Sequence, residues 1–352
     1  MRRRKNIFRR GLLLLLLAAG NPGCMPAYKA NIDEALAGQL VWPAPPEKPR
    51  IEYLWSLYSF LPEGENFSDY MLEPFDEING LSLVPYMLRP SGLCLDDHDR
   101  LYIVDQGVPR VTAVDLKTRA VKHFGFEGAG QLFMPIAVAA DLSGNIFVTD
   151  SGAGKVNIYN SDGGFTGALG GEGFFKRPTG IAFEKKSGRL FIIDTGTHVV
   201  HAFDSAGKRL FGFGKRGEGD GEFNYPTHIA AGQDGKIYVT DALNFRVQVF
   251  DSAGKFLGKF GRQGDTYADL EKPKGVSSDT FGNVYIVDAL QDMIKIFNSE
   301  GKLLLFFGEN GRAPGNFSMP LGIFVDAHNR IFVADTYNMR VQAFRLLEGK
   351  GL

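Results

Sequence analysis

The side chains best suited to catalysis or metal binding are histidines, and the sequence contains six of them. A catalytic zinc ion needs three protein ligands that converge on one point, with a fourth position open to water. The histidines are spread along the chain, at His98, His123, His198, His201, His228 and His328. The sequence also lacks a Gly-x-Ser-x-Gly elbow and a phosphate-binding glycine loop. We therefore predict no catalytic residue and no metal site, and the sequence assigns no cofactor.

Aspartates, in contrast, recur at a regular spacing. Six of them each end a short apolar run, at Asp105, Asp150, Asp194, Asp241, Asp288 and Asp335. Each follows a proline by 15 or 16 residues, and these prolines are Pro90, Pro135, Pro178, Pro226, Pro273 and Pro320. The steps between consecutive aspartates are 45, 44, 47, 47 and 47 residues. A carboxylate at the end of a strand accepts backbone N–H bonds in the following turn, so we interpret the six aspartates as structural.

The elements that must position these residues are short strands. The cleanest copy of the repeat, residues 226–261, divides into four segments rich in Val, Ile, Phe and Tyr and bounded by Gly, Asp, Asn or Pro. Four strands repeated roughly every 40–50 residues are typical of a β-propeller blade, because one twisted sheet cannot bury both faces until neighbours stack on it. Residues 90–346 therefore predict an all-β, six-bladed β-propeller of four-stranded antiparallel blades.

The last copy of the repeat is incomplete. Its third strand, residues 340–346, is followed by only six residues and has no counterpart of the fourth strand. Residues 51–60 (IEYLWSLYSF) predict a single strand near the start of the chain. We expect this strand to be the outermost strand of the sixth blade, where it closes the ring and removes an exposed edge.

Residues 1–23 have the composition of a secretory signal peptide. A run rich in Arg and Lys precedes an apolar segment that is too short to span a bilayer. Cys24 follows directly and resembles the lipidation site of bacterial lipoproteins, although the residues just before it depart from the usual motif. We expect an exported protein of the bacterial periplasm with a lipid anchor at Cys24. Ordinary cleavage nearby would instead leave a soluble periplasmic protein.

Two further segments lie outside the repeats. Residues 24–50 form a leader in which four prolines fall within residues 43–49, which favours a semi-rigid tether. The alternative is a strap that docks on the propeller wall through Trp42. Residues 61–89 form an insertion that is too apolar for a solvated linker. We expect a lid over the first blade, and the alternative is an apolar patch for a partner or a membrane surface.

The charge of the chain bears on its partners. Removal of the signal peptide takes six of the 39 basic residues, which leaves 33 against 40 acidic residues and a net charge of about −7. Nucleic-acid binding requires a concentrated basic surface, so we expect no nucleic-acid partner. The second cysteine, Cys94, falls in a strand of the first repeat and is interpreted as a small buried apolar residue.

The repeats resemble NHL repeats. The resemblance rests on Pro-x-Gly-(Ile/Val), on a Tyr/Phe-Val-x-Asp strand and on Asn-x-Arg-Val-Gln-x-Phe, which is complete in residues 244–250 and 338–344. It implies a six-bladed propeller of a type often used for protein interaction. Some propellers with similar repeats are enzymes: peptidyl-amidoglycolate lyases hold zinc with histidines from several blades, and lactonase-type propellers hold a divalent ion with Glu, Asn and Asp.

The candidate ligand contacts follow from the geometry of a blade. Loops that enter the first strand and leave the second strand of each blade emerge on one face, which we call the motif face. His228 stands on this face where the other repeats have Gly or Ala. Further candidates are Arg110, Lys155, Arg246, Arg340, Asn244 and Asn338, although pairing with the motif aspartates is the favoured role of the basic residues. We predict a non-catalytic binding or scaffold propeller that engages a protein or small ligand there, with a metal-dependent lyase or lactonase as the alternative.

Overall fold

The computed structural model describes residues 27–62, 85–171 and 173–347. Within these ranges the chain is almost entirely β-strand, interrupted by three short 3-10 helices, η2 (Gly128–Gly130), η3 (Ala242–Asn244) and η4 (Thr336–Asn338). No helix in this part of the chain is long and apolar enough to cross a membrane. The predicted signal peptide, the lipidation site Cys24 and most of the predicted lid at 61–89 lie outside the described residues.

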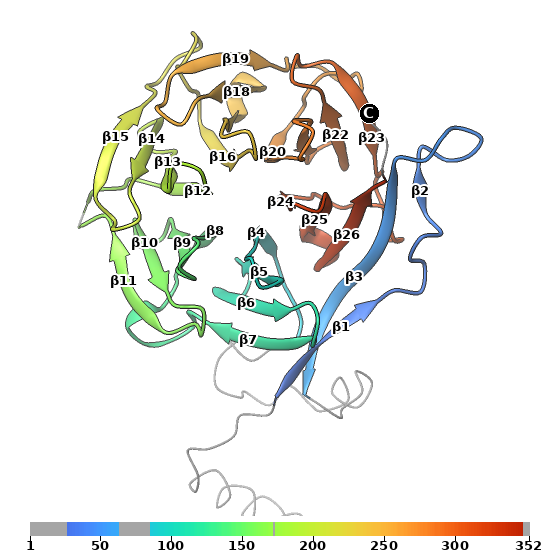
Figure 1. Ribbon diagram of the computed structural model, residues 1–352, viewed down its shortest axis with the longest axis horizontal. Helices are drawn as coiled ribbons and strands as arrows, with labels where there is room; N and C mark the ends of the chain where they lie inside the picture. The colour runs from blue at the N-terminus through green and yellow to red at the C-terminus, as the bar shows by residue number, and fades with distance from the viewer. Residues whose placement is uncertain (1–26, 63–84, 172, 348–352) are drawn as a thin grey trace, which may run out of the picture.

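Four blades are separate four-stranded antiparallel sheets (Figure 1). Blade 2 comprises β8 (Pro135–Ala140), β9 (Ile146–Asp150), β10 (Lys155–Tyr159) and β11 (Phe165–Leu169). Blade 3 comprises β12 (Pro178–Glu184), β13 (Arg189–Asp194), β14 (Val199–Phe203) and β15 (Arg209–Phe213). Blade 4 comprises β16 (Pro226–Ala231), β17 (Ile237–Asp241), β18 (Arg246–Phe250) and β19 (Phe256–Phe260). Blade 5 comprises β20 (Pro273–Ser278), β21 (Val284–Asp288), β22 (Met293–Phe297) and β23 (Leu303–Phe307).

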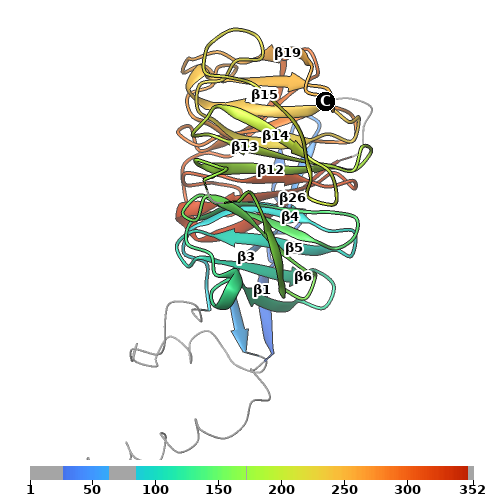
Figure 2. The same ribbon diagram turned by 90° about the vertical axis from the view of Figure 1, so that its left-hand side faces the viewer.

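Blades 1 and 6 complete the ring. Blade 1 comprises β4 (Pro90–Leu95), β5 (Arg100–Asp105), β6 (Arg110–Asp115) and β7 (Ala120–Phe124). Blade 6 comprises β24 (Ile323–Val325), β25 (Arg330–Asp335), β26 (Arg340–Leu346) and β3 (Ile51–Pro62). The pairing of β26 with β3 confirms the predicted closure by the N-terminal strand. The innermost strands contact one another in sequence, from β4 through to β24 and back to β4, so the six four-stranded groups form a closed disc (Figure 2).

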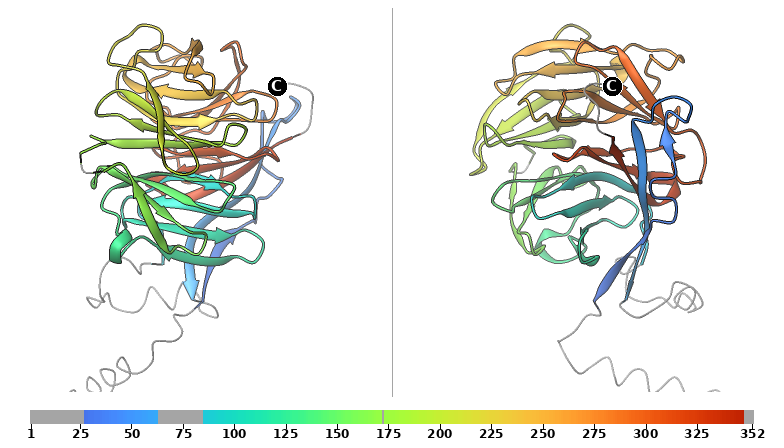
Figure 3. Two further views of the ribbon diagram at one scale, coloured as in Figure 1. Left: turned by 60° about the vertical axis from the view of Figure 1, so that its left-hand side comes forward. Right: turned by 45° about the vertical axis from the view of Figure 1, so that its right-hand side comes forward.

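The leader before β3 adds a second closure that the sequence did not predict. Strand β1 (Tyr28–Asp33) pairs with β3 on one side and with β7 on the other, so it joins blades 6 and 1 into one sheet. Strand β2 (Val41–Trp42) also pairs with β3. The Trp42 ring lies 5.7 Å from Phe307 and 5.8 Å from Phe344. Residues 28–42 therefore run along the propeller wall (Figure 3), as in the strap alternative rather than a free tether.

The apolar core lies between neighbouring blades rather than at the centre of the ring. One cluster joins blades 3 and 4 and includes Phe191, Val200, Val239 and Phe250. All five residues of β17 are buried, because adjacent blades cover both faces of its sheet. The strand patterns in the sequence are thus continuously apolar instead of alternating.

At the motif-face end the innermost strands approach one another closely. The Gly275 N–H donates to the Leu321 carbonyl at 2.9 Å, and a Cβ on Gly322 would overlap the Ser91 carbonyl oxygen. Glycine is required at these positions because there is no room for a side chain. The repeated Pro-x-Gly element therefore sets how near the blades come to the axis.

Hydroxyl groups tie neighbouring blades together at the same level. Thr240 donates to the Lys274 carbonyl and Thr336 donates to the Pro90 carbonyl, each at 2.8 Å. Thr149 donates to the Thr179 carbonyl at 2.6 Å. These bonds cross the joints between blades 4 and 5, 6 and 1, and 2 and 3, so they fix the strand ends from which the motif-face loops emerge.

Candidate functional site

The motif aspartates serve the fold, as predicted. The Asp105 carboxylate is fully buried and accepts backbone N–H bonds from Leu88 at 2.8 Å and from Arg89 at 2.9 Å. It also accepts N–H bonds from Gly107 and Val108 in the following turn. All six motif aspartates accept a backbone N–H from the loop that enters their blade, and those of blades 1, 2 and 3 also accept N–H bonds from the turn that leaves the second strand.

The Asn-x-Arg-Val-Gln element extends this arrangement in blade 4. Asp241 accepts hydrogen bonds from Asn244 at 2.8 Å, from Arg246 at 2.8 Å and from Gln248 at 3.1 Å. The Arg246 guanidinium also donates to the carbonyls of Glu218, Gly219 and Glu222 in the preceding loop. The buried motif therefore fastens an irregular loop of the motif face to the blade.

Blade 6 repeats the same cluster almost bond for bond. Asp335 accepts from Asn338 at 2.9 Å, Arg340 at 2.7 Å and Gln342 at 3.1 Å, and Arg340 donates to the carbonyls of Arg312, Ala313 and Asn316. These contacts favour a structural role for Asn244, Arg246, Asn338 and Arg340 over the predicted ligand contact, because the protein itself occupies their donors.

The remaining basic candidates differ from one another. Arg110 is fully buried and donates to the Tyr86 carbonyl at 3.0 Å; burial lowers its pKa to about 10, against the opposing effect of Asp105. This position inside the blade speaks against ligand contact. Lys155 is half-buried at the start of β10, opposite Asp150 in the strand register.

Sequence analysis missed one buried cation, Lys295. Met293 occupies the arginine position of blade 5, but the fully buried Lys295 ammonium donates to Asp288 at 3.0 Å and to the Asp269 carbonyl. Its position in the repeat is that of Gln248 and Gln342. A cation two residues beyond the usual place was the signal that could have revealed the substitution.

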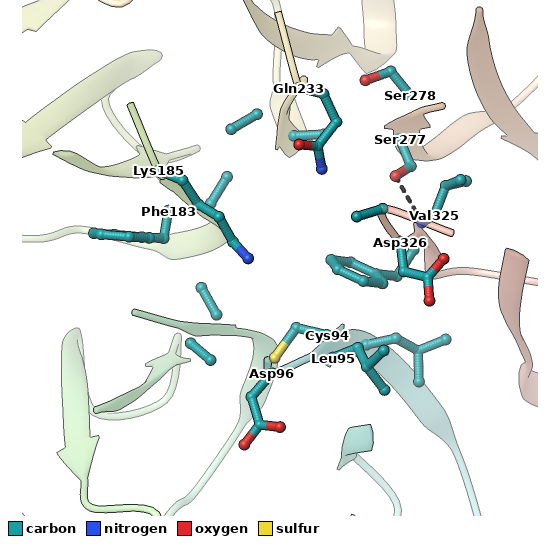
Figure 4. Close-up of a pocket in the computed structure, with 18 of the residues that line it drawn as sticks. Cys94, Leu95, Asp96, Phe183, Lys185, Gln233, Ser277, Ser278, Val325 and Asp326 are labelled. Carbon is teal, nitrogen blue, oxygen red and sulfur yellow. Dashed lines mark hydrogen bonds between the residues drawn. The ribbon is translucent and has the colours of Figure 1, made fainter. Parts of the chain in front are cut away.

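The central channel opens into a cavity on the face opposite the motif face. The cavity has a volume of about 550 Å³ and is lined by the innermost strands and by the turns that follow them. Its apolar belt takes one residue from each blade, namely Leu93, Val138, Ile181, Ile229, Val276 and Ile323. Figure 4 shows the Lys185 side chain pointing into the cavity, with Gln233 and Ser278 across from it.

Several ionisable groups around this cavity are engaged by other parts of the chain. Asp96 accepts N–H bonds from His98 and Arg100 and a side-chain bond from Arg100. Lys185 makes an exposed ion pair with Asp97 at 2.5 Å. Burial and the nearby Asp96 raise the pKa of the Cys94 thiol well above its usual value, so the thiol stays protonated. Among the described residues no group of three or more His, Cys, Asp or Glu side chains could hold a metal ion.

Exposed apolar side chains gather on the motif face. Of the fourteen large apolar side chains that are exposed in the described ranges, nine lie in motif-face loops: Phe133, Met134, Phe174, Tyr225, Leu243, Tyr267, Leu290, Tyr337 and Met339. Phe133 is 62% exposed and Tyr337 is 57% exposed. A hollow of about 600 Å³, lined in part by Arg89, Tyr337 and Met339, lies where blades 6 and 1 meet on this face.

His228 lies on the motif face at the start of β16, as expected. Its Nδ1 atom is 3.0 Å from the Thr227 hydroxyl. Burial, followed by the nearby Lys274 ammonium, lowers the pKa of His228 to about 3, so the imidazole is neutral at pH 7. Burial, followed by Lys272 and Arg177, also lowers the pKa of Lys274. The histidine therefore stands among cations rather than among carboxylates.

This geometry defines a class of protein: a closed β-propeller in which buried Asp–Asn–Arg–Gln clusters lie under the motif-face loops. Residues 223–250 and 317–344 match the family model of the NHL repeat, and they are the two segments in which the cluster is complete. The chain is thus a β-propeller in which two of the repeats match the NHL repeat.

Similar proteins include binding proteins and enzymes. The E3 ubiquitin-protein ligase NHLRC1 of Rattus norvegicus is 36% identical over 67 residues, which cover 19% of this chain and 17% of that protein. A streptogramin B lyase structure has a TM-score of 0.57 at 15% identity and covers 76% of this chain and 97% of its own. An auxiliary nutrient binding protein of Bacteroides thetaiotaomicron has a TM-score of 0.59 at 15% identity, covering 75% of this chain and 71% of its own. The two structural similarities show the fold alone.

Proposed function

We propose that this chain is a non-catalytic binding propeller that docks a protein partner on its motif face. The observation that carries the proposal is the concentration of exposed apolar side chains there, nine of the fourteen in the described residues. Exposed apolar groups that gather on one face mark interaction sites, whereas single exposed residues scattered over a surface need no explanation.

The extent of this apolar surface favours a protein over a small molecule. Its residues come from the loops and turns of five blades, from Phe133 before blade 2 to Met339 in blade 6. Tyrosine and methionine are enriched at protein interfaces. The loops that present them are held from beneath by the buried clusters of Asp241 and Asp335, so the surface is ordered before a partner binds, and little conformational entropy is lost on docking.

The second part of the proposal concerns location: an exported protein held in the periplasm by a lipid on Cys24. The basic and apolar leader and the cysteine that follows it support this. Three residues lie between Cys24 and β1, so the four residue steps from Cys24 to Tyr28 reach at most about 14 Å. Because β1 runs along the rim of the disc (Figure 3), such an anchor would hold the propeller by its rim and leave the motif face open to partners.

Site-specific cross-linking tests the docking surface. A photo-reactive amino acid is placed at Tyr337 on the motif face or, as a matched control, at Phe281, which is 55% exposed in a turn of the opposite face. In cells we expect a discrete protein adduct from position 337 and none from position 281. Equal adducts from both positions, or none from 337, would refute docking on the motif face.

A further inference from the structure

The centre of the motif face carries basic residues on three consecutive blades, blades 3, 4 and 5. Arg177 and Lys272 immediately precede the prolines that open β12 and β20, Lys274 follows the second proline, and His228 lies two residues after the proline of β16. All four residues lie at, or directly before, the motif-face end of an innermost strand. The cations of blades 3 and 5 therefore flank the histidine of blade 4.

Backbone contacts hold these four residues together. A Cβ on Gly180 of β12 would lie 3.0 Å from the Cα atom of His228, so blades 3 and 4 touch at the histidine. The Lys274 carbonyl accepts the Thr240 hydroxyl at 2.8 Å, which joins blades 4 and 5. Asp194 and Asp288 fix the backbone of Arg177 and Lys272 through N–H bonds of 2.7 and 2.8 Å. The cluster is thus built on strand ends rather than on a free loop.

In the described part of the chain these charges have no acidic partner. Across the residues that the structure describes, Arg177, Lys272 and Lys274 form no ion pair. The nearest motif carboxylates, Asp194, Asp241 and Asp288, are fully buried and directed at backbone N–H groups, at Arg246 and at Lys295. Burial, followed by repulsion from Lys272 and Arg177, disfavours the charged form of Lys274. An anion at this place would offset the repulsion.

Blades 2 and 6 have apolar residues at the equivalent positions, whereas blade 1 has Arg89 and Ser91. The positions just before and just after the opening proline hold Met134 and Ile136 in blade 2, and Met319 and Leu321 in blade 6. Met134 is 51% exposed and the other three side chains are half-buried. A ligand that covers the axis therefore meets the basic residues of blades 3 to 5, and also methionine, leucine and isoleucine of blades 6 and 2.

We propose that Arg177, His228, Lys272 and Lys274 bind a carboxylate of an acidic segment on the docking protein, with an apolar side chain of that segment against blades 6 and 2. The inference rests on the proposed function. Charge complementarity selects an acidic partner. A nucleic-acid backbone is disfavoured because this cluster is small and the chain carries 40 acidic against 39 basic residues. The extent of the apolar surface disfavours a free small anion.

The test uses the purified propeller and two synthetic peptides, one with adjacent Glu, Glu, Leu and Phe residues and one in which both Glu are Gln. NMR of the labelled His228 ring reports occupancy directly. We expect the Glu peptide to shift the His228 ring resonances at pH 7, where the Glu side chains are ionised, and Lys274→Met to weaken binding at least 10-fold. Lys186→Met, on the opposite face, is the matched control and should change nothing.

The outcomes separate the alternatives. If inorganic phosphate shifts His228 but the Glu peptide does not, the site takes phosphate and the proposal of a protein carboxylate is overturned. Equal binding of the Glu and Gln peptides would also overturn it. If Lys274→Met leaves cross-linking from Tyr337 undiminished, the carboxylate site is wrong but docking on the motif face stands. If the protein without Lys274→Met gives no adduct from Tyr337, the docking function itself is contradicted.

Discussion

Replacing Arg340 with methionine is expected to destabilise the propeller by about 3–5 kcal/mol. Arg340 is almost fully buried and is paired with Asp335 at 2.7 Å. Removing one partner of a buried pair leaves an uncompensated charge, which typically costs about 3–5 kcal/mol. The carbonyls of Arg312, Ala313 and Asn316 lose their donor as well. Against a total stability of about 5–15 kcal/mol for a folded domain, this is a large fraction.

Urea unfolding at pH 7, followed by far-UV circular dichroism, measures the change. Asp335→Asn combined with Arg340→Met should recover part of the loss, because the double variant buries no unpaired charge. Lys155→Met, at the equivalent position of blade 2 but half-buried, is the matched control and should stay within about 1 kcal/mol of the parent. If Arg340→Met unfolds within about 1 kcal/mol of the parent yet abolishes partner binding, Arg340 is a ligand contact and the structural assignment fails.

Three further predictions concern the ring closure, pH and metal content. Deletion of residues up to 62 removes β1 and β3 and should abolish cooperative unfolding, whereas an unchanged melting transition would contradict closure by the N-terminal strand. Burial lowers the pKa of His123 to about 3, so below pH 6.5 the unfolded chain binds a proton that the folded chain does not. The free energy of unfolding should therefore fall as pH drops from 6.5 towards 3, by at most about 1.4 kcal/mol per pH unit. In His123→Gln the urea midpoint should depend less on pH between pH 7 and pH 5. Elemental analysis should find less than one zinc or calcium per chain; a stoichiometric metal lost in His228→Ala, together with turnover, would favour the metal-dependent enzyme.

The repeat predicted the fold because the spacing between its proline and its aspartate is set by a hydrogen bond that every blade needs. Each Asp of the motif must reach backbone N–H groups about 16 residues back, as Asp105 reaches Arg89, so proline and aspartate keep their separation. The closure was predictable because β26 needed an outer partner. The role of β1 could not be predicted, because its six residues have the pattern of an ordinary strand, and that pattern does not show that the strand pairs with two blades.

The candidate site was harder to predict, because one residue type serves two purposes. Arg246 and Arg177 are both arginines near the start of a strand, yet one is buried beneath a carboxylate and the other forms no ion pair in the described part of the chain. Burial depends on the register of the third strand and on the path of the preceding loop, which the sequence pattern does not contain. The cavity opposite the motif face was missed because its apolar belt looks like strand core.

The position two residues after the opening proline is where blade 4 departs from the repeat. Blades 5 and 6 have Gly275 and Gly322 there, because a side chain would strike the Leu321 or Ser91 carbonyl of the next blade. Blade 4 has His228, and Gly180 of blade 3 leaves the space beside its backbone. A half-buried imidazole held neutral by burial and by a neighbouring cation weakens the fold as pH falls. Stability therefore does not explain its presence where the repeat favours glycine, and this agrees with the proposed contact with a partner.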